Sequence, residues 1–179
     1  MEIVLLAFAA FVVAALVQGT LRRRRNPYEE VAWAQLPAGL CDELERLLPG
    51  FRPGAARLTR LRDEARIEGD RDGERVRIEA DFDAAGNLVE LEIDTPGHLR
   101  GTGSAQLEDL PAAARTELDR LLGDQGPAFE PWRIRVGRTR EGEDGYEVKG
   151  RAGEWSWEIE LTASGRLIEL ERERKRRRA

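Results

Sequence analysis

The sequence has little of the side-chain chemistry on which most enzymes depend. It contains one cysteine and one histidine in 179 residues. A single cysteine, Cys41, excludes an intrachain disulfide and a zinc site built from several cysteines of one chain. A single histidine, His98, excludes most catalytic triads and histidine-rich metal centres. We therefore expect no catalytic site, cofactor or metal, and we interpret the two residues as a packing thiol and a surface histidine rather than a catalytic couple.

Aromatic residues are also scarce, at 6%, whereas charged residues reach 35%. A hydrophobic content of 41% still excludes wholesale disorder, so we expect thin, sheet-like cores in one ordinary domain or two small ones. The net charge of -5 is unevenly distributed, because arginines gather near both ends and the region between them is acidic. An acidic body argues against nucleic acid as the main partner, and no small-molecule substrate is evident.

One long apolar run is present, and it begins at Ile3. Residues 3–21 carry no charge and would form a helix of roughly 28 Å, enough to cross a bilayer if the flanking arginines snorkel. We predict a transmembrane helix over residues 1–21 that contacts membrane lipid, followed by the anchoring block Arg22, Arg23, Arg24 and Arg25.

A cleaved signal peptide is the alternative, since Val17-Gln18-Gly19 offers small residues for cleavage. Export signals begin with positive charge, whereas here Met1-Glu2 precedes the run and the arginines follow it. The same asymmetry predicts a single-pass protein whose soluble region faces the cytoplasm, with the periplasmic or extracellular face as the alternative.

The soluble region matches itself at an offset of 74 to 79 residues. The first copy opens with LPAGLCDELERLLPG and the second with LPAAARTELDRLLGD. The paired leucines fall on one helical face in each copy: Leu44, Leu47 and Leu48 in the first, and Leu118, Leu121 and Leu122 in the second. Each copy is therefore expected to begin with an amphipathic helix.

After each helix the hydrophobic period changes to two, as expected for half-buried antiparallel strands. Four alternating residues of the first copy, Val76, Ile78, Ala80 and Phe82, correspond to Trp155, Trp157, Ile159 and Leu161 of the second. A glycine turn and a last strand follow in both copies. We expect three tryptophans of the second copy to lie in its core: Trp132, Trp155 and Trp157.

These patterns predict an α+β fold in which the transmembrane helix precedes two repeats, each of one helix packed on a small antiparallel sheet of about four strands. The sequence leaves open whether the two repeats share one sheet. The expected segments are a basic juxtamembrane linker over 22–34, repeat 1 over 35–96, a linker over 97–103, repeat 2 over 104–171 and a basic tail over 172–179.

The order of helix, strands, glycine turn and strand, with RVRIEADFDAAGNLVELEID in one copy and GYEVKGRAGEWSWEIELTASGRLIELE in the other, resembles the PepSY-like family. This resemblance implies small non-catalytic modules, often outside the cytoplasm, that regulate or inhibit peptidases or sense conditions at the cell envelope. The chain departs from that pattern because no peptidase is attached and its charge distribution favours the cytoplasm.

Two motifs have alternative interpretations. The segment DFDAAGNLVELE places Asp81, Asp83, Gly86, Leu88 and Glu92 at ligand positions of an EF-hand loop, but its flanks have period two and favour a plain hairpin. The C-terminal basic residues form either a solvated tail or a contact for anionic lipid head groups. These residues are Arg174, Lys175, Arg176, Arg177 and Arg178.

The absence of a nucleophile, base or metal constellation favours a membrane-anchored, non-catalytic binding or regulatory module that acts on a protein partner. The alternative is a structural or envelope-assembly protein that organises a complex at the membrane surface. A hydrolase is a remote third possibility.

Overall fold

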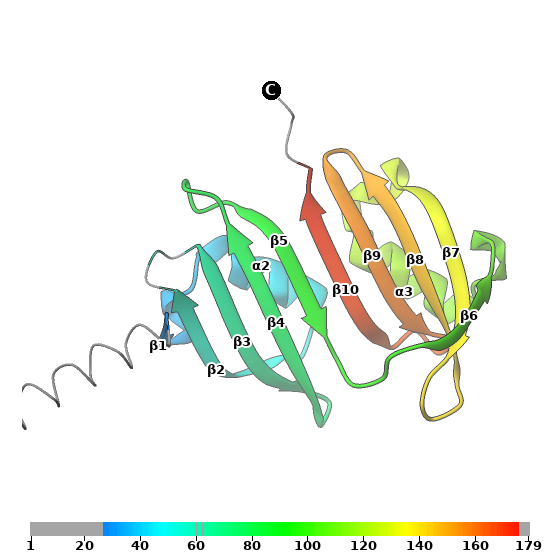
Figure 1. The fold of residues 1–179 in the computed structure, drawn as a ribbon, viewed down its shortest axis with the longest axis horizontal. Helices are drawn as coiled ribbons and strands as arrows, with labels where there is room; N and C mark the ends of the chain where they lie inside the picture. Colours follow the sequence, from blue (N-terminus) through cyan, green and yellow to red (C-terminus); the bar gives the residue numbers. More distant parts are fainter. Residues whose placement is uncertain (1–26, 60, 62, 176–179) are drawn as a thin grey trace, which may run out of the picture.

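The computed structural model describes residues 27–59, 61 and 63–175, and its strands form one antiparallel sheet of ten strands (Figure 1). The strand order is β1-β2-β3-β4-β5-β10-β9-β8-β7-β6. The strands are β1 (Tyr28–Val31), β2 (Arg52–Thr59), β3 (Glu64–Arg71), β4 (Glu74–Phe82), β5 (Leu88–Asp94), β6 (Arg100–Ser104), β7 (Glu130–Arg138), β8 (Asp144–Ala152), β9 (Trp155–Thr162) and β10 (Leu167–Arg174).

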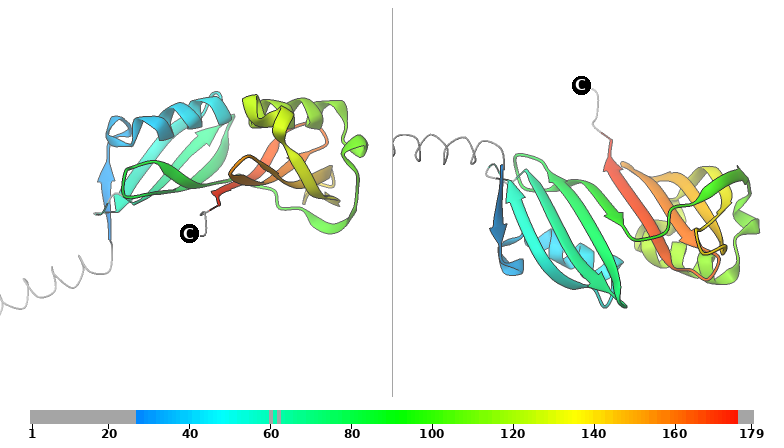
Figure 2. Two further views of the ribbon diagram at one scale, coloured as in Figure 1. Left: turned by 90° about the horizontal axis from the view of Figure 1, so that it is seen from above. Right: turned by 60° about the horizontal axis from the view of Figure 1, so that its bottom comes forward.

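Two α-helices, α2 (Ala38–Leu47) and α3 (Ala112–Leu122), lie on the same face of this sheet (Figure 2). Three short 3-10 helices complete the described elements: η1 (Trp33–Gln35), η2 (Leu107–Asp109) and η3 (Gly123–Ala128). The core lies between the helices and the sheet, where the predicted helix leucines and the alternating strand residues, except Trp132 and the partly buried Trp155, are buried. The expected helix faces are therefore confirmed.

The predicted fold class is wrong, because the strands form one ten-stranded sheet and not a small sheet of about four strands under each helix. Strands β5 and β10 pair along five residues, from Glu90↔Glu173 to Asp94↔Glu169, and so join the halves β1–β5 and β6–β10 into one sheet. Each strand would otherwise be an exposed edge with unpaired backbone groups, which is unfavourable. The molecule is therefore dominated by one large sheet rather than built from separate α+β units.

The predicted membrane helix over 1–21 and the block Arg22–Arg25 lie outside the described residues. Within the part of the chain that the structure describes, no helix is long and apolar enough to cross a bilayer. The transmembrane part of the predicted fold class therefore has no counterpart in the described fold.

A local two-fold relation runs through the junction of β5 and β10. Glu92 and Glu171 occupy equivalent positions in the two halves, and they pair directly with each other. On either side of this pair, Leu91 pairs with Arg172 and Ile93 pairs with Leu170. Leu91 is equivalent to Leu170 and Ile93 to Arg172, so the same two-fold relation converts one flanking pair into the other. The junction thus places equivalent residues of the two halves next to each other.

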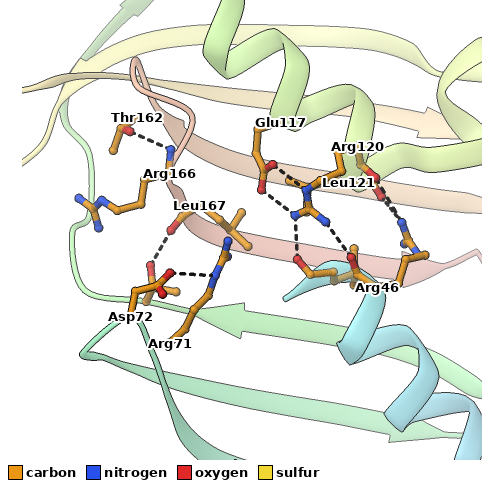
Figure 3. Close-up of polar contacts among 11 residues, drawn as sticks. Arg46, Arg71, Asp72, Glu117, Arg120, Leu121, Thr162, Arg166 and Leu167 are labelled. Carbon is orange, nitrogen blue, oxygen red and sulfur yellow. Dashed lines mark hydrogen bonds and ion pairs between the residues drawn. The ribbon is translucent and has the colours of Figure 1, made fainter. Parts of the chain in front are cut away.

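The C-terminal ends of the two helices meet above this junction and cap each other (Figure 3). Arg120 donates to the carbonyl oxygens of Arg46 and Leu47 at 2.7 and 2.8 Å. Arg46 donates in return to the carbonyl oxygen of Leu121 at 2.9 Å. Because the last carbonyls of a helix lack partners within it and carry partial negative charge, the two arginines satisfy and neutralise both ends.

A buried ion pair also connects the halves on the helix side. Arg172 of β10 is 6% exposed and donates to a carboxylate oxygen of Glu43 on α2. Its guanidinium carbon lies 4.4 Å from the ring centre of Trp155 and 5.1 Å from that of Trp157. Burial of a charge is tolerable here because the carboxylate and the aromatic faces compensate it.

Several predicted segment boundaries differ from the structure. Strands β1 and β6, the two edges of the sheet, fall in segments predicted as linkers, and β10 continues through Arg174 into the predicted tail. Trp132, predicted as core, is 54% exposed because β7 changes register between Pro131 and Arg133, which displaces the ring from the core alternation.

Candidate functional site

The sheet face that the helices leave uncovered carries a dense group of acidic side chains. We call it the open face. Side chains alternate across the sheet, so every second residue of β5, β9 and β10 projects from the open face, and most of these residues are acidic. The eight carboxylates that we call the carboxylate strip are Glu90, Glu92, Asp94, Glu158, Glu160, Glu169, Glu171 and Glu173.

The strand register places these carboxylates directly opposite one another. Across the β5–β10 junction the three opposing pairs are Glu90↔Glu173, Glu92↔Glu171 and Asp94↔Glu169. Across β10 and β9 the pairs are Glu169↔Glu160 and Glu171↔Glu158. Opposing side chains in an antiparallel pair have Cβ atoms about 4.5–5.5 Å apart, and like charges at that distance destabilise the sheet.

Basic residues flank the carboxylate strip on both sides. On one side Arg77 lies 3.9 Å from Asp94. On the other side Lys149 forms an ion pair with Glu158, and Arg133 contacts Glu147 at 2.8 Å. The cations therefore compensate Asp94 on one margin and Glu158 on the other, whereas Glu92 and Glu90 face the carboxylates Glu79 and Asp81 of β4.

Glu169 lies at this centre and has the most perturbed carboxyl group. Its pKa is raised from 4.5 to about 7, first by partial burial and then by the neighbouring carboxylates Glu160, Glu158 and Glu92. Each effect disfavours the ionised form, the first through desolvation and the second through repulsion. Glu169 therefore exchanges its proton near neutral pH.

Other members of the strip have raised pKa values for the same reasons. Burial raises the pKa of Glu160, with Glu147 as the next largest cause, and one carboxylate oxygen of Glu160 is buried without a hydrogen-bond partner in the described structure. Burial also raises the pKa of Glu90 and of Glu92, and their acidic neighbours add to it. Four members of the strip, Glu90, Glu92, Glu160 and Glu169, therefore resist ionisation.

Three of these acids could be considered as metal ligands. One carboxylate oxygen from each of Glu147, Glu158 and Glu160 lies within 4.8 Å of the others. However, Lys149 already pairs with Glu158 and lies 3.9 Å from Glu147, and Arg133 also pairs with Glu147. These cations compensate two of the three carboxylates, so the set fits a metal ion poorly.

The connection from β5 to β6 borders the strip. Thr95 donates to the carbonyl oxygens of Leu167 and Ile168 at the start of β10, at 2.8 and 2.9 Å. His98 follows and is exposed, and its charge favours ionisation of Glu160 and Glu169. Cys41 lies on α2, where its thiol contacts the carbonyl oxygen of Trp33, and the described structure shows no hydrogen bond between Cys41 and His98.

The residues with predicted membrane roles are only partly described. Arg174 ends β10 and pairs with Glu154 at 2.8 Å, and Lys175 follows it. Both line a cleft of about 800 Å³ together with acidic side chains, including Asp83, Glu90 and Glu173. Arg176, Arg177 and Arg178 lie outside the described residues, and their contact with lipid stays a prediction.

The segment with EF-hand spacing forms the hairpin between β4 and β5. Its carboxylate Asp83 accepts hydrogen bonds from the backbone N–H groups of Ala85 and Asn87, both at 2.9 Å. Asp81 does not belong to this turn; it lies on β4, opposite Glu90 of β5. The plain-hairpin interpretation is therefore confirmed for this segment.

Comparison with known proteins leaves the family of the chain open. No protein-family model matches it, and no curated protein matches it. The resemblance to the PepSY-like family stays a prediction, and the predicted cytoplasmic location finds no support in the described residues.

Solved structures with a similar arrangement come from Bacteroides species. A candidate periplasmic protein of Bacteroides eggerthii has 11% identity and a TM-score of 0.32, over 76% of this chain and 88% of that chain. A DUF2874 family protein of Bacteroides uniformis has 11% identity and a TM-score of 0.31, over the same shares. A BLIP-like protein of Bacteroides fragilis has 14% identity and a TM-score of 0.31, over 80% and 90%. Likenesses of this strength assign no function.

Proposed function

We propose that this protein is a non-catalytic binding module whose carboxylate strip engages a basic surface of a protein partner. The observation that carries the proposal is the row of three acidic pairs across the β5–β10 junction, on a sheet face that the helices leave open. Most antiparallel sheets place mixed charges on a solvated face, because opposing like charges weaken the pairing.

Electrostatics explains why a basic partner suits this surface. Repulsion within the strip costs free energy in the unbound protein, and a positive surface laid across it removes that cost. Binding also favours the ionised form of Glu169, so the partner should release the proton that this group holds near pH 7. We therefore expect the affinity to fall as the pH drops below about 7, the pKa of Glu169 in the unbound protein.

The experiment uses the full chain and a fluorescently labelled arginine-rich peptide, with binding followed by anisotropy. We expect the wild-type chain to bind this peptide and to ignore an acidic peptide of equal length. The double variant Glu92→Gln/Glu171→Gln removes two charges from the centre of the strip and should weaken binding at least tenfold.

The matched control removes two charges elsewhere. Glu45→Gln/Asp119→Asn changes exposed residues of α2 and α3, on the helix-covered face of the sheet, and leaves the net charge equal to that of the strip variant. Affinity should stay close to that of the wild type. Equal weakening in both double variants would mean that only net charge matters, and the proposed site would be wrong.

A structural role is a second candidate, because the open face continues across both halves and offers a broad surface for a permanent complex. The dissociation rate of the natural partner separates the two. Regulated binding requires release within seconds to minutes, whereas a permanent assembly retains its partner for hours.

A further inference from the structure

Trp132 is an apolar side chain that the fold leaves in solvent. Among the described residues, Trp132 and Leu61 are the large hydrophobic side chains with high exposure, at 54% and 84%. Trp132 lies where β7 changes register beside the edge strand β6. An exposed indole at an irregular point of a strand often marks a contact surface, because tryptophan is enriched at binding hot spots.

The surroundings of Trp132 place it at the margin of the carboxylate strip. It lines a shallow hollow of about 60 Å³ together with Lys149, Ser156, Glu158, Glu171 and Glu173. Lys149 and Glu158 pair with each other across β8 and β9. Glu171 and Glu173 of β10 have no arginine or lysine within ion-pair distance in the described chain, so two uncompensated carboxylates face the hollow beside an aromatic ring.

An aromatic face next to carboxylates is suited to a cation with an apolar stem. The ring attracts the positive charge, the stem covers the exposed indole, and the charged head reaches the carboxylates. The core of this protein already combines these groups, since Arg172 lies over Trp155 and pairs with Glu43. Arginine suits such a position better than lysine, because its planar guanidinium stacks on the ring and forms two parallel hydrogen bonds to a carboxylate.

We propose that Trp132 is the anchor of the interface, and that an arginine side chain of the basic protein partner stacks on its indole and reaches Glu171 and Glu173. This inference rests on the proposed function and adds a residue that determines which basic side chain binds. The strip supplies general attraction to positive charge, and Trp132 distinguishes arginine from lysine.

The experiment compares two labelled peptides of equal length and charge, one arginine-rich and one lysine-rich, on the full chain. The wild type should bind the arginine peptide more tightly. Trp132→Ala should lower the affinity for the arginine peptide about tenfold and the affinity for the lysine peptide by less. The difference between the two affinities should therefore become smaller. Trp132→Phe keeps an aromatic face and should retain part of the preference.

Two further variants locate the effect. Leu61→Ala removes the other exposed hydrophobic side chain and should change neither affinity. Glu171→Gln/Glu173→Gln combined with Trp132→Ala should weaken arginine binding by less than the product of the separate effects, because all three groups contact one side chain.

The outcomes separate this inference from the proposed function. If Trp132→Ala binds both peptides like the wild type while Glu92→Gln/Glu171→Gln loses binding, the anchor is wrong and the strip stands. If the wild type binds neither peptide, the proposed function and the anchor both fail.

Discussion

Glu169 shows how the environment of one side chain determines the pH response of the molecule. It lies in a row of four carboxylates across β8, β9, β10 and β5, and this row ends at Arg135 on one side and Arg77 on the other. The charge repulsion is therefore concentrated at its middle members, Glu160 and Glu169. A carboxyl group with a raised pKa in the folded state binds its proton more tightly there than in the unfolded chain.

We expect stability to decrease as the pH rises from about 4.5 to about 7, the two pKa values of Glu169 in the unfolded and folded states. Below this window the group is protonated in both states, and above it the full cost of ionisation is present. Glu169→Gln should remove this part of the pH dependence and stabilise the protein above pH 7 by about 1–2 kcal/mol, after allowance for solvent screening. Urea denaturation at several pH values measures it.

Glu108→Gln is the control for that series, because Glu108 is exposed on η2 and is not a member of the strip. Its stability profile should follow that of the wild type. If the free energy of unfolding of Glu169→Gln still falls between pH 4.5 and 7 as it does in the wild type, a group other than Glu169 causes this pH dependence.

Glycines of the sheet give a second prediction at the residue scale. A Cβ at Gly150 of β8 would lie 2.2 Å from the ring of Phe129 and 2.9 Å from the carbonyl oxygen of Glu130. We expect Gly150→Ala to lower the free energy of unfolding by about 2–3 kcal/mol, because ring and backbone must both move. Gly39→Ala is the matched control. Nothing lies within 4 Å of a Cβ there, and alanine favours the helix by up to about 1 kcal/mol.

Thermal and urea denaturation of the two glycine variants should therefore shift in opposite directions. Equal stability of Gly150→Ala and the wild type would contradict the packing of Phe129 against this strand.

At the same scale, the sequence predicted most inward positions and missed Trp132. Val76, Ile78, Ala80 and Phe82 are buried as predicted, whereas Trp132, which was expected in the core, is exposed. The register shift adds one residue to β7 without interrupting the alternation of hydrophobic and polar residues in the sequence, so this alternation could not reveal the shift.

At the scale of elements, the helices were predictable and their mutual contact was not. The leucine spacing identified the buried faces of α2 and α3. The contact between their C-terminal ends depends on how the two halves are placed, which local patterns do not encode. Arg46 and Arg120 follow Glu43 and Glu117 by one helical turn, and each pair reads in the sequence as an ordinary surface ion pair.

We expect Arg120→Ala to destabilise the protein by about 1–2 kcal/mol, because two carbonyl groups at the end of α2 lose their charged donor. Arg46→Ala should cost a similar amount. Arg140→Ala, in the exposed turn between β7 and β8, should cost less than about 0.5 kcal/mol. The free energies of unfolding from urea titrations test the series. If all three variants lose the same stability, the caps do not join the helices.

The edge strands were missed for a different reason. β1 and β6 are short, and β6 contains the sequence Arg-Gly-Thr-Gly-Ser, which lacks hydrophobic alternation and reads as a loop. Each becomes a strand because a longer neighbour offers its unpaired backbone groups. Strand β1 also makes side-chain contacts of its own, because the hydroxyl of Tyr28 donates to Glu64 and the guanidinium of Arg66 lies over the Tyr28 ring.

For the whole molecule, the decisive feature is the antiparallel pairing of β5 with β10. On separate sheets the outward acidic residues of these two strands would form two rows that lie apart from each other. Pairing of the two strands brings the acidic rows together and creates the carboxylate strip. The acidic residues can be read from the sequence, but their concentration on one surface results from the pairing of strands whose residues lie about 80 positions apart in the chain.

The most direct test of the account is a map of where a basic partner touches the full chain, obtained from amide and indole chemical shifts during titration with the arginine-rich peptide. We predict that the largest changes occur on β5, β9 and β10 and at the indole of Trp132, while α2 and α3 change little. Changes concentrated on the helices or on the edge strand β1 would contradict it.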